Sequence, residues 1–328
     1  MLPCSTRGSE NMKTPIIAGA VGTWLPVVAW LAPLVAATAL ALCLCLPGSL
    51  RAGDFPTVKL PLPDMHATES NGVPSIDLRN YFEINGITGL VVQLRTTSGT
   101  FNLDTFATEA PVTVSNFLNY VNSGRYVTSI VHRSDRSLGV IQGGGYMLPT
   151  FDTMVTDPPI PLEYRLPNAR GTIAMARAAA TNSATSQWFI NTKDNSTTLG
   201  QANGGGYAVF GRVTGTGMAV VDAIGALPVY AFSSPYGQMP LRNYVTNTQV
   251  LPEHAIAITT AEAIPVFPTA AGQNSVVTFS VTTSNPTLAD ATTHGSLLSI
   301  LPTAGQNGHA HITVTTADSN GNTAQNSF

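Results

Sequence analysis

Cysteine and charged residues are scarce in this sequence. The three cysteines, Cys4, Cys43 and Cys45, lie near the N-terminus, so disulfides do not cross-link the part of the chain that follows. Charged residues account for 10% of the chain, compared with about 25% in an average soluble protein, and the formal net charge is -3. The sequence has no cluster of Lys and Arg of the kind that binds nucleic acid. We therefore expect no nucleic-acid partner.

The motifs of nucleophilic catalysis are also missing. The chain has no Gly-x-Ser-x-Gly elbow, and no thiol follows Cys45. A dispersed Ser-His-Asp triad stays open, because triads are defined by geometry rather than by a motif. Hydrolysis through an activated nucleophile is therefore a minor alternative.

Metal and phosphate sites have little support in the sequence. His309 and His311 would lie on one face of a strand, a spacing that can hold a metal, but no third ligand accompanies them. The runs QGGGY at 142–146 and NGGGY at 203–207 lack the Lys-Ser/Thr of a phosphate-binding loop. Glycines in such runs permit tight turns or close approach of the backbone. We expect neither a metal nor a cofactor.

The N-terminal segment has the pattern of an export signal. Residues 14–50 contain no charged side chain, and Arg7 and Lys13 precede them. Such a pattern is typical of a secretory signal peptide, which here would occupy residues 1–52. The apolar stretch at 16–46 is also long enough to span a bilayer if it is not cleaved. Both interpretations place the rest of the chain in the periplasm or outside the cell, either released or attached to the membrane.

The pattern becomes mainly β after a proline-rich stretch. Residues 53–82 predict a linker that ends in a short pairing strand, and residues 83–262 predict the main domain. Within that domain, apolar residues alternate on either side of Ser98 and Gly99, which predicts a hairpin over 89–106. Further short apolar runs are separated by turn residues. The fold class that these runs indicate is mainly β.

Two segments have helical periodicity instead. From Pro111 onward, apolar residues recur at helical spacing, and Gly124 is placed to end the helix. Residues 217–225 form a second, shorter candidate. The main domain should therefore contain two amphipathic helices.

The C-terminal residues 263–328 have a different composition. Thr-rich alternating runs with Asn-Gly turns favour a β-sandwich repeat. This stretch is short for a complete sandwich domain. We expect a partial sandwich, or one that another chain completes.

Three blocks in the main domain resemble the cyclophilin family of peptidyl-prolyl cis-trans isomerases. VHRSDRSLGVIQGGGY at 131–146 resembles the family's His-Arg to Gln-Gly-Gly block. GTIAMARAAATNSATSQWFIN at 171–191 resembles its Met-Ala to Ser-Gln-Phe-Phe block, and GGGYAVFGRV at 204–213 resembles its Val-Phe-Gly block. Their order and spacing match over residues 85–262. The resemblance implies a closed eight-stranded antiparallel barrel capped by two α-helices, with a shallow groove for an X-Pro segment.

The chemistry of such a family explains why the first block lacks nucleophiles and metal ligands. Rotation about a peptide C–N bond has a barrier of about 18–20 kcal/mol, because twisting removes amide resonance. The twisted nitrogen regains a lone pair, so a hydrogen-bond donor fixed beside it binds the transition state better than either planar isomer. Arg133, at the family's catalytic position, would supply this donor from a rigid, permanently protonated fork.

The resemblance also implies the binding residues. Phe189 and Leu199 would form an apolar hollow for the proline ring. Gln142 would hydrogen-bond the substrate backbone, and Gln187 would help to orient Arg133. The other expected contacts are His132 at the rim, Leu138, Val140 and Tyr207 beside the hollow, and Ala176 through its main chain. Without the resemblance, the large apolar residues would equally suit an ordinary core.

The sequence departs from the family pattern in two places. The interval from Arg133 to Gln142 is one residue longer than usual, and Gly139 stands where a pocket Phe is expected. Leu138 would fill that space from a shifted register. Thr198 stands where the family has an aromatic residue, and members without it tend to bind cyclosporin poorly. We therefore expect a looser pocket and weak inhibitor sensitivity.

Two functions are consistent with these patterns. The first is a peptidyl-prolyl cis-trans isomerase that assists the folding of exported proteins and acts on proline-containing polypeptides. The alternative is a cyclophilin-fold peptide-binding or cell-surface structural module with little isomerase activity, in which residues 263–328 act as an adhesion-like repeat. The departures at Gly139 and Thr198 keep this alternative open.

Overall fold

The computed structural model describes residues 54–328, apart from 69–74 and 320. The expected signal peptide or membrane anchor, over residues 1–52, lies outside the described residues. The described residues belong to one compact unit, 51–328. Within them, no helix is long and apolar enough to cross a membrane.

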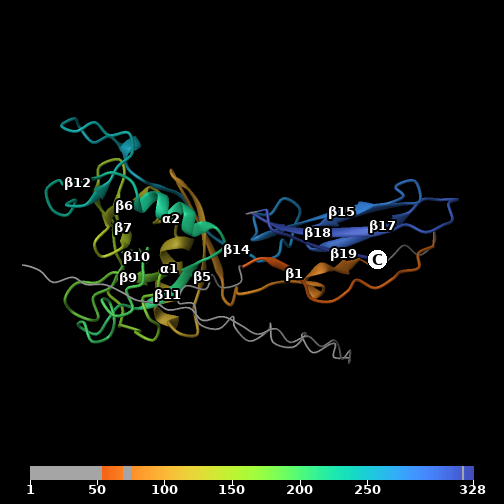
Figure 1. The fold of residues 1–328 in the computed structure, drawn as a ribbon, viewed down its shortest axis with the longest axis horizontal. Coiled ribbons are helices and arrows are strands. Elements are labelled where there is room, and N and C mark those ends of the chain that lie inside the picture. The colour runs from red at the N-terminus through yellow and green to blue at the C-terminus, as the bar shows by residue number, and fades with distance from the viewer. Residues whose placement is uncertain (1–53, 69–74, 320) are drawn as a thin grey trace, which may run out of the picture. The chain divides into compact units, whose positions relative to one another are not determined.

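A large antiparallel sheet forms the main domain. Its strands follow the order β14-β4-β5-β11-β9-β10-β7-β6, and β8 pairs with β7 (Figure 1). The predicted hairpin is confirmed, because β4 and β5 pair from Val91 opposite Asp104 to Thr96 opposite Gly99. The strands are β4 (Val91–Thr96), β5 (Gly99–Thr105), β6 (Ser129–Asp135), β7 (Val140–Met147), β8 (Asp152–Thr153), β9 (Thr172–Met175), β10 (Trp188–Asn191), β11 (Val209–Val213) and β14 (Ile258–Ile264).

The two ends of this sheet approach each other. Among the described residues no continuous ladder joins β6 to β14, but Ile130 and Ala257 form one isolated antiparallel bridge. The Val131 amide donates to the Ile256 carbonyl at 2.9 Å beside this bridge. The mainly β class with a curled eight-strand sheet is therefore confirmed, whereas full closure of the barrel stays a prediction.

Both predicted helices are present, as α1 (Pro111–Asn122) and α2 (Gly217–Gly225). The apolar face of α1 presents Phe117 to the sheet, where its ring lies 4.9 Å from that of Phe210. From α2, Val221 and Ile224 join the same core, which also contains Trp188. Both helices therefore pack against the same apolar core of the sheet.

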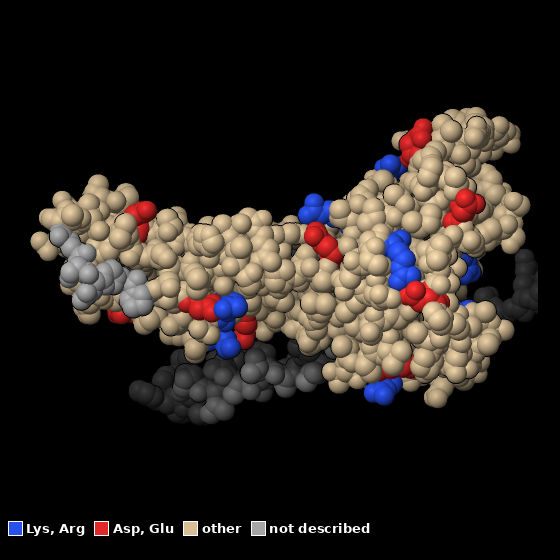
Figure 2. Space-filling view, turned by 180° about the vertical axis from the view of Figure 1, so that it is seen from behind, with Lys and Arg blue, Asp and Glu red and all other residues tan. Residues whose placement is uncertain are grey.

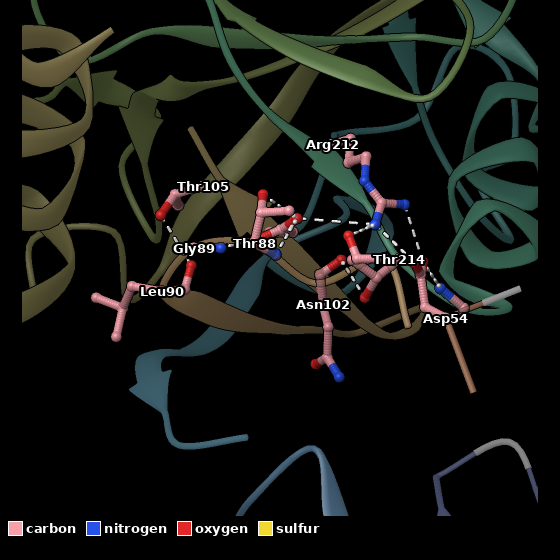
Figure 3. A network of polar contacts seen from close by, with 11 residues as sticks. Asp54, Thr88, Gly89, Leu90, Asn102, Thr105, Arg212 and Thr214 are labelled. Carbon is pink, nitrogen blue, oxygen red and sulfur yellow. Dashed lines mark hydrogen bonds and ion pairs between the residues drawn. The ribbon is translucent and has the colours of Figure 1, made fainter. Parts of the chain in front are cut away.

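A polar network attaches the start of the described chain to the main sheet (Figure 3). The guanidinium of Arg212 on β11 pairs with Asp54 at 2.6 Å and also donates to the Gly86 carbonyl at 2.6 Å. Asp104 is fully buried, lies 3.7 Å from Arg212 and accepts from the Gly89 amide at 2.8 Å. Because each buried charge has a partner, the network fixes the chain around residue 54 against β5 and β11.

Two three-stranded sheets form a second module from the C-terminal residues. One has the order β15-β18-β19 and the other the order β16-β17-β2. The strands are β2 (Ile76–Asp77), β15 (Val277–Thr283), β16 (Ala289–His294), β17 (Leu297–Pro302), β18 (Ile312–Asp318) and β19 (Thr323–Ser327). His309 and His311 precede β18 and are exposed, so the expectation that both lie on a strand is wrong.

The stretch that the sequence predicts as a linker contributes to this second module. Its residues Leu62 and Leu78 are buried in one apolar cluster with Leu298 and Val314. A buried amide, Asn326 on β19, accepts from the Leu62 amide at 3.1 Å and donates to the Leu60 carbonyl at 2.7 Å. This stretch also holds β1 (Pro56–Val58), which pairs with β3 (Phe82–Ile84), and a short 3-10 helix, Leu78–Asn80. The domain boundaries stay predictions.

An insertion between α2 and β14 forms an aromatic lobe beside β6. It contains β12 (Val229–Tyr230), β13 (Met239–Pro240) and a 3-10 helix, Pro252–His254. Tyr236 lies 5.0 Å, ring to ring, from Tyr146 of β7.

Charged side chains are few and scattered on the face shown in Figure 2, in line with the composition.

Candidate active site

A row of paired residues crosses four neighbouring strands of the main sheet. Arg133 on β6 pairs with Gln142 on β7, Gln142 with Phe189 on β10, and Phe189 with Ala174 on β9. Figure 1 labels these four strands. Directly paired residues of antiparallel strands place their side chains on the same face. Arg133, Gln142 and Phe189 therefore share one face of the sheet.

Apolar residues gather on this face in a cluster separate from the helix-covered core. Val140, Phe189 and Leu199 are at most 8% exposed, and the ring of Tyr207 stands edge-on to Phe189 with a centroid distance of 5.4 Å. The cluster contains Val140, Ala174, Phe189, Leu199 and Val209, with Phe106, Leu138, Leu166, Ala176 and Tyr207 packed against it. The five apolar residues predicted to line or flank the hollow belong to it, Leu138 included, and so does Ala176, which was expected to contact substrate through its main chain.

Three different side chains hold the Arg133 guanidinium. Its Nε donates to Gln238 Oε1 at 2.9 Å, its Nη1 to Gln142 Oε1 at 3.2 Å and its Nη2 to Asp135 Oδ2 at 2.7 Å. The side chain of Arg133 remains 35% exposed. A planar fork held at all three nitrogens has a fixed orientation and stays accessible from solvent.

Gln142 connects the guanidinium to the apolar side of the row. While its Oε1 accepts from Arg133, its Nε2 donates to Gln187 Oε1 at 2.8 Å. A Cβ at Gly145 would come within 2.7 Å of the Gln187 side chain, so glycine at this position leaves the space that Gln187 occupies. The expected close approach at the QGGGY run is thereby confirmed.

Asp135 stands at the end of β6, where the chain turns toward β7. Its Oδ1 accepts from the Ser137 hydroxyl and the Leu138 amide, both at 2.9 Å, and Oδ2 pairs with Arg133. Burial raises the pKa of this carboxyl, but those hydrogen bonds and the charge of Arg133 outweigh burial and hold the pKa below its usual value. Asp135 is thus ionised at neutral pH.

Gly139, at the position of the expected pocket Phe, closes this turn. Its φ is +71°, a conformation that side-chain-bearing residues rarely adopt. The aliphatic part of Lys193 occupies the space where a Cβ would lie. The turn geometry therefore favours glycine here and leaves Leu138 to contact the apolar cluster.

A buried amide positions the loops that carry Leu199 and Tyr207. Asn168 is fully buried, and its Nδ2 donates to the carbonyls of both residues at 3.3 Å. Its Oδ1 accepts from Asn191 Nδ2 on β10 at 3.2 Å. The loops that carry Leu199 and Tyr207 are thereby connected to β10. The guanidinium carbon of Arg177 lies over the Tyr207 ring, 4.7 Å from its centroid.

His132 is placed differently from the other predicted site residues. It is 4% exposed, does not join the apolar cluster, and faces the Tyr146 ring at a centroid distance of 4.7 Å. Burial, with a smaller contribution from the charge of Arg133, lowers the pKa of His132 to about 4. The expected position at the rim is therefore wrong, because the imidazole is enclosed and neutral at physiological pH.

The structure adds neighbours that sequence reasoning missed. Gln238 lies 105 residues from Arg133, and no local pattern marks it. Asp135 lies two residues from Arg133 on β6. Residues two apart on a strand share a face, so the sequence alone could have indicated Asp135 as a neighbour of Arg133. Thr198, which stands at the position of the family's aromatic residue, is exposed.

The sequence is similar to those of known proteins. Residues 91–246 match the family model described as cyclophilin type peptidyl-prolyl cis-trans isomerase/CLD. Peptidyl-prolyl cis-trans isomerase cyp18 of Streptomyces antibioticus is 48% identical over 138 residues, which cover 40% of this chain and 81% of that protein. Peptidyl-prolyl cis-trans isomerase B of Escherichia coli (strain K12) is 43% identical over 139 residues, or 41% and 83% of the two chains.

The chain belongs to the cyclophilin-type peptidyl-prolyl cis-trans isomerase family. This confirms the family that the three sequence blocks indicate and, with it, the enzyme class. Among solved structures, a Cryptosporidium parvum cyclophilin determined in the presence of the dipeptide Ala-Pro aligns with a TM-score of 0.40 and 22% identity. The alignment covers 53% of this chain and 99% of that cyclophilin.

Proposed function

We propose that this cyclophilin catalyses rotation about X-Pro peptide bonds through a hydrogen bond from Arg133 to the twisted amide. The observation that carries the proposal is the row of paired residues, in which the guanidinium and the apolar cluster around Phe189 share one sheet face. A proline ring anchored on the cluster would place its amide nitrogen toward Gln142 and Arg133. The donor and the anchor come from different strands of one rigid sheet.

The hydrogen bonds of Arg133 suggest which of its protons act. A guanidinium has five N–H donors. Gln238, Gln142 and Asp135 take one proton each, from Nε, Nη1 and Nη2. One proton on each terminal nitrogen is left. One of these two would hold the carbonyl of the residue before proline, and the other would meet the proline nitrogen as its lone pair develops.

The apolar cluster would hold the proline ring while the preceding residue turns. A saturated ring gains little from polar contacts, so burial against Phe189 and Leu199 supplies its binding energy. Because both residues are almost completely covered by the rest of the cluster, the ring would lie on the small part of their surface that stays exposed. Gln142 would then contact the substrate backbone.

The same proposal includes the cellular role. Arg7 and Lys13 followed by the uncharged residues 14–50 support export of the isomerase domain. Exported proteins with X-Pro bonds would be its substrates, since those bonds equilibrate over tens to hundreds of seconds without a catalyst. Mass determination of the N-terminus of the exported protein tests this part, and a mass that begins at Met1 in a soluble cytoplasmic fraction would contradict it.

Exchange spectroscopy of an Ala-Pro peptide tests the catalytic proposal directly. The cis-trans exchange rate is measured with the wild-type chain, with Arg133→Ala and with Arg136→Ala. Arg136 is a matched control, because it is an exposed arginine three residues away that donates to the carbonyls of Ala226 and Leu227. We expect Arg133→Ala to lower the rate by about 10²-fold or more and Arg136→Ala to leave it unchanged. Equal rates for all three proteins would favour the binding-module alternative.

A further inference from the structure

The carboxylate of Asp135 has two separate sets of contacts. Its Oδ1 closes the turn after β6 by accepting from Ser137 Oγ and the Leu138 amide. Its Oδ2 faces the other way and pairs with Arg133 Nη2 at 2.7 Å. The Asp135 side chain is 10% exposed, so this ion pair is largely shielded on the carboxylate side. One residue thus connects the turn to the guanidinium.

The turn that Asp135 closes lies within the interval between Arg133 and Gln142. The turn runs from Asp135 to Gly139, whose amide donates to the Asp135 carbonyl at 2.7 Å. In the register of β6 and β7, Asp135 pairs with Val140, two residues along from the Arg133 and Gln142 pair. Residues two apart on a strand share a face. The carboxylate therefore projects on the same face as the guanidinium.

We infer that Asp135 is a positioning residue for Arg133, one that fixes the orientation of the guanidinium fork toward the substrate amide. The inference rests on the proposed function of Arg133. Gln142 and Gln238 are neutral acceptors, so the shortest of the three contacts and the charge-assisted one comes from Asp135. Without it, Nη2 would lose its fixed direction, and the fork would rotate about the remaining contacts.

A structural role confined to the turn would predict a different pattern of effects. Replacement of Asp135 by Asn keeps an oxygen for Ser137 and Leu138 but places an NH2 group against the guanidinium. Replacement by Glu keeps the negative charge near Arg133 and displaces the turn contacts. Ser137→Ala removes one turn contact and leaves the ion pair intact. These three variants separate the two sides of the carboxylate.

The test combines steady-state kinetics on an Ala-Pro peptide with NMR of the arginine side chains in the full chain. We expect Asp135→Asn to lower kcat by about 5- to 10-fold with less than a 2-fold change in KM, because the donor is misoriented while the proline hollow is intact. The same variant should accelerate rotation of the Arg133 guanidinium about its Nε–Cζ bond. Asp135→Glu should recover most of kcat, and Ser137→Ala should match the wild type.

Two outcomes would overturn the inference. One is a wild-type kcat and a wild-type guanidinium rotation rate in Asp135→Asn. The other is equal loss of kcat in Asp135→Asn, Asp135→Glu and Ser137→Ala, which would assign the carboxylate to the turn alone. Arg133→Ala in the same assay keeps the two proposals apart. If that variant retains full activity, the proposed function fails, and guanidinium rotation in Asp135→Asn still decides whether the carboxylate holds the fork.

Discussion

Gln142 lies between Arg133 and Gln187 with its amide oriented from both sides. Its Oε1 accepts from Arg133 Nη1 at 3.2 Å and its Nε2 donates to Gln187 Oε1 at 2.8 Å. An amide that exchanges its O and N positions would lose both bonds, so the pair of neighbours selects one orientation. A chain of side-chain hydrogen bonds thus runs from Arg133 on β6 through Gln142 on β7 to Gln187, the residue that precedes β10.

Gln142→Ala should lower kcat/KM by about 10-fold, because the substitution removes one acceptor from Arg133 and one donor to the substrate backbone. The measurement is cis-trans exchange of an Ala-Pro peptide by NMR. Gln201→Ala, at an exposed glutamine in the loop after Leu199, serves as the control and should match the wild type. Activity of Gln142→Ala equal to that of the control would remove Gln142 from the proposed site.

Phe189→Leu should raise KM by about 10-fold while unfolding free energy falls by about 1 kcal/mol, because the aromatic surface beneath the proline ring shrinks but stays apolar. Phe210→Leu is the matched control, since Phe210 is fully buried on the helix-covered face. It should cost similar stability and leave KM unchanged. Equal KM values for the two variants would show that the Phe189 cluster does not bind proline.

Much of this site was predictable because its parts are local in sequence. Arg133 and Gln142 fall in the first block and Phe189 in the second, and Leu199 lies between the second and third blocks, so the family spacing was sufficient to name them. The pairing of β6, β7 and β10 then places them on one face. The helix at Pro111–Asn122 was equally clear, since apolar spacing and terminal residues agree.

The remaining contacts depend on long-range packing that no local pattern encodes. Gln238 reaches Arg133 from the aromatic lobe, and Leu62 reaches Asn326 from the opposite end of the chain. Residues 53–82 suggested a linker because they are rich in proline and have no periodic pattern of apolar residues. Single residues such as Leu78 can be buried without such a pattern. The family resemblance implied a rim position for His132, whereas β6 has register shifts on both sides of Val131, which the sequence does not mark.

The unfolding free energy should fall as pH decreases from 6.5 toward 4, because of His132. The pKa of His132 is about 4 in the folded protein and 6.5 in the unfolded chain, so the unfolded state binds the proton first. The neutral imidazole makes its full contribution to the unfolding free energy above pH 6.5, and about 3 kcal/mol of that free energy is lost by pH 4. Denaturant unfolding at several pH values measures this slope.

His132→Gln separates this slope from the titration of carboxylates. The variant should lose stability less steeply than the wild type between pH 6.5 and 5, whatever its stability at pH 8. Asp135 titrates below its usual pKa and therefore contributes at lower pH. Parallel slopes for wild type and His132→Gln would show that the imidazole is not enclosed.

Asn168→Ala should lower the unfolding free energy by about 2–4 kcal/mol and raise KM, because the carbonyls of Leu199 and Tyr207 lose a buried donor. Asn203→Ala is the control in the same region. Asn203 is exposed and donates to the carbonyls of Thr197 and Thr198 at 2.8 and 3.0 Å. It should cost less than about 1 kcal/mol, as exposed contacts do. Equal effects on KM would contradict the role of Asn168.

Asn326→Ala should destabilise the second module without slowing catalysis. The buried Asn326 amide is hydrogen-bonded to the backbone at both Leu60 and Leu62, so the substitution leaves the buried Leu62 amide and the partly buried Leu60 carbonyl without this partner and should cost about 2 kcal/mol. Hydrogen exchange at the Leu62 amide should accelerate, while the exchange rate of an Ala-Pro peptide should equal that of the wild type. Gln325→Ala, at the exposed neighbouring residue, provides the comparison. Unchanged exchange at Leu62 would mean that this part of the stretch 53–82 does not pack on the C-terminal sheets and acts as the linker that its composition suggests.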